Sequence, residues 1–159
     1  MALEQEIDQG LRTVKIVWAA IFSSLAIFAV FGPLVGEKLT AGLPAQTFTI
    51  LRTVLYVVSL GAIVGSRVLR RKMLMASSSP SNPPATSTAQ IVHRYTAAVV
   101  VSLGLVEAVA IYGFILYILG KNQVDLYALI LLAAAAMLLH APKRSELLDL
   151  VYNQANRQA

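Results

Sequence analysis

Cysteine is absent from this chain of 159 residues, and charged residues make up only 13% of it. Without cysteine there can be no disulfide framework, no Cys-ligated zinc or iron–sulfur centre and no thiol nucleophile. Histidine is nearly as scarce. His93 and His140 have no cysteine and no close carboxylate at ligand spacing, so we expect neither to bind a metal.

Catalytic motifs are missing as well. The sequence has no P-loop, no G-x-G-x-x-G, no H-E-x-x-H and no recognisable Ser-His-Asp arrangement. We therefore expect no enzyme activity, no catalytic residues and no cofactor. The basic residues that give the net charge of +5 are grouped beside apolar segments. There they indicate membrane topology and not nucleic-acid binding.

Apolar sequence is what the chain has in abundance, because 57% of its residues are hydrophobic. Four long apolar stretches predict membrane spans at about 14–35, 44–66, 96–119 and 124–141. The last is the shortest, and a buried or re-entrant helix is the alternative for it. We expect an all-α fold: one integral membrane domain, 1–159, built as a four-helix bundle with the lipid bilayer as its surroundings.

The flanking segments predict shorter elements. Leu3, Ile7, Leu11 and Val14 recur at helical spacing before the first span, which predicts a short amphipathic helix at the interface. A second amphipathic helix is expected at 143–157, after a proline. Between the second and third spans, residues 73–90 are rich in Ser, Pro, Ala and Thr, which predicts a flexible cytoplasmic linker.

The basic residues also predict orientation. When four spans are threaded, Lys38 and Lys121 fall on one side and most other Lys and Arg residues fall on the opposite side, beside both termini. Cytoplasmic loops carry such an excess of basic residues. We therefore expect a multi-pass protein of a cell membrane, of the bacterial inner-membrane kind, with both termini in the cytoplasm.

One carboxyl group interrupts the third apolar stretch. Glu107 lies near the middle of its span, where an ionisable side chain costs roughly 2.5–3.5 kcal/mol on insertion scales. No residue three or four positions away on its own helix has a side-chain donor. Glu107 therefore needs a partner from another helix, or it is held protonated because hydrocarbon disfavours the charged form.

A partner is available in the second span, which should run antiparallel to the third. Counted from the span centres, Arg52 stands about five residues, or roughly 7.5 Å, from the level of Glu107. Tyr56 is expected at about the depth of Glu107 and could supply a hydroxyl. These positions predict an internal Arg52–Glu107 pair that fixes helix packing. Alternatively, Arg52 extends to the outer interface and leaves Glu107 free.

The segment GLVEAVAIYGFILYILG, residues 104–120, resembles the carboxylate-bearing helix of the rotor-ring c subunit, the proteolipid of F- and V-type ATP synthases. The matching positions are Gly104, Glu107, Ala108, Ile111, Tyr112 and Gly113. The resemblance implies that Glu107, with Tyr112, binds a proton or Na⁺. The chain departs from that family in its long linker, in Arg52 and in the lack of a long glycine stripe.

Two functions therefore follow from the sequence. In the first, the chain is a proteolipid-like element that binds and translocates a proton or Na⁺ through Glu107, alone, as a homo-oligomer or in a larger membrane complex. In the second, it is a structural or accessory subunit of a membrane complex, in which Glu107 and Arg52 form a packing pair without a transport role.

Overall fold

The computed structural model describes residues 2–36, 42–76 and 88–158, and every regular element in these ranges is an α-helix. The all-α prediction is confirmed. In chain order the helices are α1 (Ala2–Gly36), α2 (Ala45–Ala76), α3 (Thr88–Gly120), α4 (Gln123–Leu139) and α5 (Arg144–Gln158).

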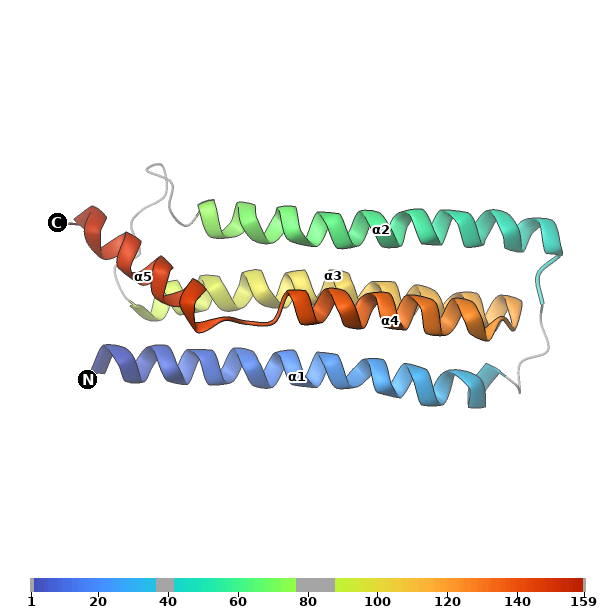
Figure 1. The fold of residues 1–159 in the computed structure, drawn as a ribbon, viewed down its shortest axis with the longest axis horizontal. Helices are drawn as coiled ribbons and strands as arrows, with labels where there is room; N and C mark the ends of the chain where they lie inside the picture. Colours follow the sequence, from blue (N-terminus) through green and yellow to red (C-terminus); the bar gives the residue numbers. More distant parts are fainter. Residues whose placement is uncertain (1, 37–41, 77–87, 159) are drawn as a thin grey trace.

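Four of the helices, α1 to α4, lie side by side along the long axis of the molecule (Figure 1). The N-terminus and α5 lie at one end, which we call the terminal end. The α1–α2 connection and the α3–α4 turn lie at the opposite end. Helices α1 and α3 therefore run parallel to each other and antiparallel to α2 and α4.

The helices have the length and composition of membrane spans. Within the described residues, Ile7–Gly36, Ala45–Leu74 and Gln90–Gly120 are each long and apolar enough to cross a bilayer. Helix α4 and most of α5 pass the same test together, as a pair bent by 43°. The chain is thus a membrane-spanning protein with three such helices, or four when the bent pair counts as one span.

The helices extend beyond the apolar stretches that predicted them. Helix α2 continues from 66 to Ala76 and includes the basic cluster, and α3 begins at Thr88 instead of 96. Backbone hydrogen bonding does not stop where hydrophobicity stops, so polar turns prolong a helix beyond the lipid. Both ends of the predicted linker 73–90 are accordingly helical, and its centre, 77–87, lies outside the described residues.

The predicted N-terminal helix is not a separate element, because α1 is continuous from Ala2 to Gly36. Its spacing is nevertheless that of a packed face: Ile7, Leu11 and Val14 are at most 5% exposed. They lie in the core and not along an interface. At the C-terminus, α5 spans Arg144–Gln158, close to the predicted 143–157.

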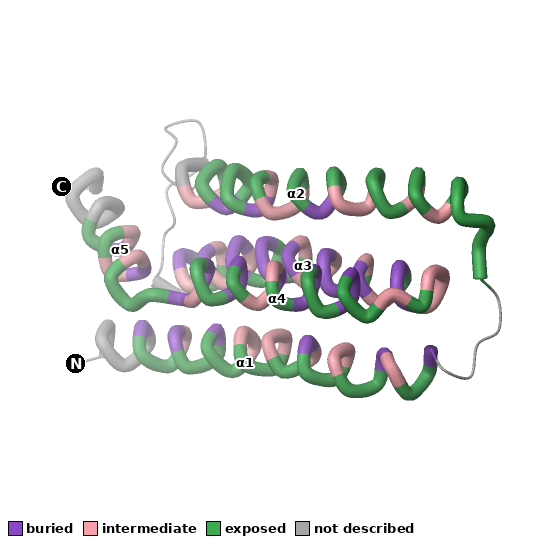
Figure 2. Tube along the Cα trace, turned by 45° about the vertical axis from the view of Figure 1, so that its right-hand side comes forward, coloured by how far each residue is buried: buried purple, intermediate pink, exposed green. Residues whose placement is uncertain are grey.

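Helix α3 is the centre of the molecule and contacts each of the other four helices. Figure 2 shows its buried residues surrounded by outward-facing, exposed surfaces of α1 and α2. The exposed surfaces are strongly apolar. Ile16, Val30, Ile50, Val57 and Val64 are each at least 60% exposed. Such surfaces suit lipid, which solvates them as well as a protein core would.

The buried side chains of helix α2 are polar. Its buried residues are Ser59, Ser66 and Arg70, whereas the buried hydrophobic residues of the described chain all come from the other helices. Without a hydrophobic driving force in lipid, small and polar residues are the usual contacts between membrane helices. Here Ser102 of α3 donates to the carbonyl oxygen of Ser66, and partly buried apolar side chains of α2 such as Leu51, Leu55 and Ile63 pack against the core beside it.

The α3–α4 turn consists of Lys121 and Asn122 alone. Lys121 has a positive φ of 54°, the left-handed conformation that commonly ends a helix. Asn122 caps α4, because its side chain accepts a hydrogen bond from the amide of Val124. Gly113 allows the two helices to approach closely: a Cβ there would lie 2.9 Å from Leu129 Cβ and 3.1 Å from the carbonyl oxygen of Leu126.

Candidate functional site

Glu107 is partly buried on α3, two residues from the middle of the candidate span Gln90–Gly120. Its Oε1 lies 2.5 Å from the hydroxyl oxygen of Ser24 on α1. The parallel packing of α1 against α3 brings the two residues to one level. Similar offsets bring Gly10 against Val92 and Gly36 against Tyr117. The partner of Glu107 is therefore a neutral hydroxyl from the first helix.

The hydrogen bonds at Ser24 bear on the protonation of Glu107. The Ser24 hydroxyl also lies 2.7 Å from the carbonyl oxygen of Ile21. A serine hydroxyl has one proton, and a carbonyl oxygen and an ionised carboxylate are both acceptors. One proton would have to serve both. If Glu107 is protonated, it donates to Ser24 Oγ, Ser24 donates to the carbonyl, and each short contact has its own proton.

No described cation neutralises Glu107. The ion pairs within the described residues join Arg52 to Asp125, Arg70 to Glu146 and Arg144 to Asp8. Tyr112, the other residue implied by the resemblance, is partly buried and packs against the apolar core. Within the part of the chain that the structure describes, Glu107 therefore has a hydroxyl partner and no ion-pair partner.

One face of α3 beside Glu107 is uncovered. Val101, Ile111 and Ile115 are between 37% and 42% exposed, and a Cβ on the exposed Gly104 would meet nothing within 4 Å. These four positions are separated by three, seven and four residues, which are one or two helical turns, and they form one stripe along the helix. Glu107 lies between this open stripe and α1, so lipid or another protein can approach its carboxyl from the side.

A second carboxyl group, that of Asp125 in the first turn of α4, lies near the end of the molecule opposite the terminal end. It is fully buried and accepts three side-chain contacts. Arg52 Nη2 lies 2.8 Å from Oδ1, the Tyr56 hydroxyl donates to Oδ1 at 2.8 Å, and Asn122 Nδ2 donates to Oδ2 at 3.1 Å. The guanidinium also lies 5.9 Å from the centre of the Tyr56 ring.

The predicted Arg52–Glu107 pair is therefore wrong, because Arg52 and Tyr56 both bind Asp125 instead. The reason is the register of α2 on α3. Phe48 lies against Gly120, and Ser66 lies against Ser102. In this register Arg52 is level with Leu116, nine residues beyond Glu107, or about 13.5 Å. Tyr56 is level with Tyr112, so it too misses Glu107.

A third polar cluster lies at the terminal end. Arg70 of α2 binds Glu146 Oε2 at 2.5 Å and the carbonyl oxygen of His140 at 2.9 Å. His140 is buried, and its Nδ1 donates to the carbonyl oxygen of Ala136 at 2.6 Å. The cluster joins α2 to the bend between α4 and α5. Within the described residues, no three metal-binding side chains gather as they would around an ion.

Sequence reasoning found Glu107, Arg52 and Tyr56 but missed Ser24 and Asp125. A signal for Asp125 was present: it follows Asn122 by three residues at the start of an apolar helix, which is the spacing of a capping box. Ser24 had no comparable signal, because an intramembrane serine usually binds its own helix, as Ser23 does with Ala19.

Comparison with known proteins gives no relative from which a role could be inferred: no family model, no curated protein and no solved structure matches this chain.

Proposed function

We propose that this chain is a small multi-pass membrane protein that binds and releases a proton at Glu107. The supporting observation is the hydrogen bonding of Glu107: a carboxyl group near mid-span with a serine hydroxyl as its partner and no described cation beside it. Because one face of α3 beside it is open, the proton can be exchanged when water or a cation on another subunit approaches.

The oxygen atoms at the site favour a proton over Na⁺. Glu107, Ser24 and the carbonyl of Ile21 are the oxygen groups that the structure brings together there. A proton needs one donor and one acceptor, whereas hard metal cations take a shell of several oxygen ligands. The resemblance to the rotor-ring proteolipid over residues 104–120 agrees with either ion, so the choice of a proton depends on this ligand count.

In this proposal the terminal end lies in the cytoplasm, because the basic cluster Arg67, Arg70, Arg71 and Lys72 of α2 and Arg144 of α5 lie there. α1, α2, α3 and the bent α4–α5 pair form a four-helix bundle across a cell membrane. The uncovered stripe of α3 faces lipid, a second copy or another subunit of a membrane complex.

Carbodiimide labelling tests the proposal, because the reagent modifies protonated carboxyl groups that are accessible from lipid. We expect modification of Glu107 in the intact membrane protein, decreasing as pH rises and unchanged by Na⁺. Asp125, which is fully buried and ion-paired, is the internal control and should stay unmodified. Glu107→Gln should lose the label while keeping its hydrogen-bonding group.

Three results would contradict proton binding at this site: no modification of Glu107 at any pH, modification that does not depend on pH, or protection by Na⁺ at constant pH. Proton uptake by vesicles containing the protein then tests release across the membrane. A pH-sensitive dye inside the vesicles should respond for the wild type and not for Glu107→Gln.

A second function is favoured by the Arg52–Asp125 pair. A fully buried carboxylate held by Arg52, Tyr56 and Asn122 fixes α2 on α4, as expected of a structural or accessory subunit of a membrane complex. Here the packing pair is Arg52 with Asp125, and Glu107 only joins α3 to α1. Normal assembly of a Glu107→Gln variant, together with loss of assembly in Asp125→Asn, would favour this function.

A further inference from the structure

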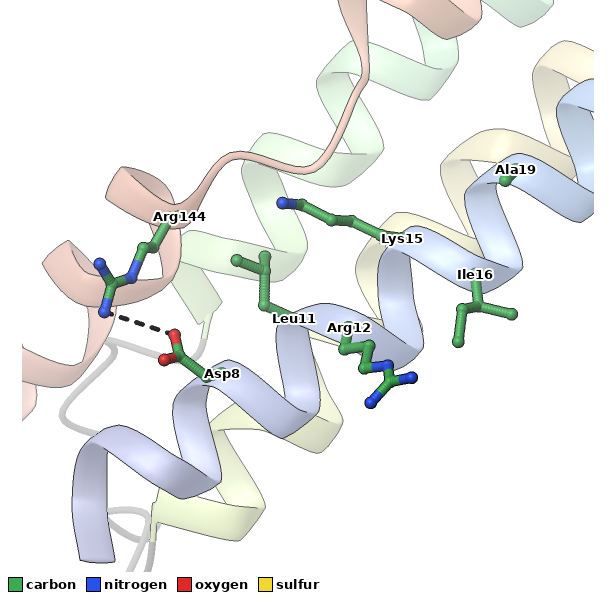
Figure 3. Close-up of a pocket in the computed structure, with 7 residues that line it drawn as sticks. All are labelled: Asp8, Leu11, Arg12, Lys15, Ile16, Ala19 and Arg144. Atoms are coloured by element: carbon green, nitrogen blue, oxygen red, sulfur yellow. Dashed lines mark ion pairs between the residues drawn. The ribbon is translucent and has the colours of Figure 1, made fainter. Parts of the chain in front are cut away.

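An open pocket of about 500 Å³ lies on the flank of α1 at the terminal end, beside the start of α5. Figure 3 shows the residues along it: Arg144 and Asp8 lie at one end, and Ala19 lies at the other. The lining residues are Asp8, Leu11, Arg12, Lys15, Ile16, Ala19 and Arg144. None of them takes part in the contacts of Glu107 or Asp125.

The pocket is basic. Its lining has three cations, Arg12, Lys15 and Arg144, and a single anion, Asp8. Arg12 and Lys15 are exposed and make no ion pair or side-chain hydrogen bond with the rest of the described chain. Within the described residues, two cations without an ion-pair partner therefore lie one helical turn apart near the end of a candidate membrane span.

The third cation is only weakly held by its partner. Arg144 Nη2 lies 3.3 Å from Asp8 Oδ1, and these side chains are 55% and 62% exposed. Exposed pairs of this kind contribute little, with a median near 0–1 kcal/mol. An anion that enters the pocket can therefore compete with Asp8 for the guanidinium.

The pocket is also amphipathic along α1. From Asp8 to Ala19 the helix rises by about 16.5 Å, and the lining changes from charged to apolar over that length. Beyond the pocket, exposed apolar side chains continue on the same face of α1. Arg12, Ile16, Ala19, Ser23, Ile27, Val30 and Leu34 recur at steps of three or four residues, and all are exposed.

This stripe matches the chemistry of a phospholipid: a basic site at the membrane surface joined to an apolar track that descends into the hydrocarbon. Basic pockets on the cytoplasmic side of membrane helices bind anionic headgroups. We propose that the pocket binds the phosphate of one anionic phospholipid through Arg12, Lys15 and Arg144, with an acyl chain along Ile16, Ala19 and Ile27.

The single tryptophan of the chain provides the test. Trp18 lies next to Ala19 in sequence, and its indole donates to the carbonyl oxygen of Met137. In vesicles, we expect phosphatidylglycerol with brominated acyl chains to quench Trp18 more strongly than brominated phosphatidylcholine at the same mole fraction. Lys15→Gln and Arg12→Gln should each reduce this preference about fivefold, since one basic side chain near a membrane surface contributes roughly that factor.

The matched control is Arg71→Gln, which removes one exposed basic charge from the same end of the molecule but outside the pocket. It should leave the preference unchanged. Equal quenching by both lipids would overturn the proposal, and so would an equal loss in Arg71→Gln, which would indicate general surface charge. Loss of the preference in millimolar glycerol phosphate would also overturn it, because the site would then bind a soluble phosphate and not a lipid.

Discussion

At the residue scale, the two carboxyl groups of the apolar region differ in their burial and in their partners. Asp125 is fully buried, and an arginine, a tyrosine and an asparagine bind its two oxygens. Glu107 is partly buried and has one hydroxyl partner from another helix. The first arrangement pairs a carboxylate with a cation and two further donors, whereas the second gives a carboxyl group a single neutral partner.

Replacement of Ser24 by alanine should destabilise the protein. Glu107 would lose its partner on α1, and hydrogen bonds between membrane helices contribute about 0.6–1.7 kcal/mol. The measurement is the free energy of unfolding in mixed micelles. Ser23→Ala is the matched control, because the Ser23 hydroxyl binds the carbonyl of its own helix. Equal effects of the two substitutions would contradict the Ser24–Glu107 contact.

A double-mutant cycle with Arg52→Gln and Asp125→Asn should show a coupling of about 0.5–3 kcal/mol, as expected for groups in contact. The same cycle with Arg52→Gln and Glu107→Gln should be additive within about 0.5 kcal/mol, since these residues are far apart in the register of the two helices. Unfolding free energies provide both values. Coupling in the second cycle and not in the first would support the Arg52–Glu107 pair that was predicted from the sequence, and would contradict the Arg52–Asp125 pair.

The difference between the Arg52–Asp125 and Arg52–Glu107 pairs indicates which part of the site could be predicted from the sequence. Glu107 was recognisable because a carboxyl group in an apolar stretch is costly wherever it lies. Its partner depended on how far α2 slides along α3, and the apolar pattern leaves that offset open by several residues. An error of four residues, about 6 Å, was enough to assign Arg52 to the wrong carboxyl group.

At the element scale, α2 carries a polar seam. Arg52, Tyr56, Ser59, Ser66 and Arg70 share one face, with steps that fit alternating intervals of four and three residues. Such a period is that of a helix packed along a partner. Hydropathy was enough to predict the span of α2. The polar seam could be found only by looking for regularly spaced polar residues. Its pattern was in the sequence and would have assigned Arg52 to a packed face.

The close contact of α3 with α4 depends on Gly113. In Gly113→Ala, the new methyl group would meet Leu129 and the backbone of Leu126, so we expect a loss of about 1–3 kcal/mol. Gly104→Ala is the matched control on the same helix. Its methyl group would enter open space and should increase stability by up to about 1 kcal/mol through helix propensity. Thermal unfolding of both variants tests this difference.

At the scale of the whole molecule, the ends differ in charge, and the absence of cysteine makes the orientation measurable. We expect Gln9→Cys and Ser145→Cys to react with a membrane-impermeant thiol reagent from the cytoplasmic side only. Gln46→Cys and Gln123→Cys should react from the other side only. All four positions are exposed. If positions 9 and 145 reacted from opposite sides, the terminal end could not lie on one side of the membrane.

The two-residue turn at Lys121 and Asn122 has a consequence for biosynthesis. Helix α4 has only 17 residues, and the Asp125 carboxyl group lies in its first turn. It is therefore a poor candidate to enter a bilayer by itself. Because only two residues connect it to α3, we expect α4 to insert together with α3 as a helical hairpin. Arg52, synthesised earlier, would then be in place to pair with the Asp125 carboxylate when the hairpin packs against α2.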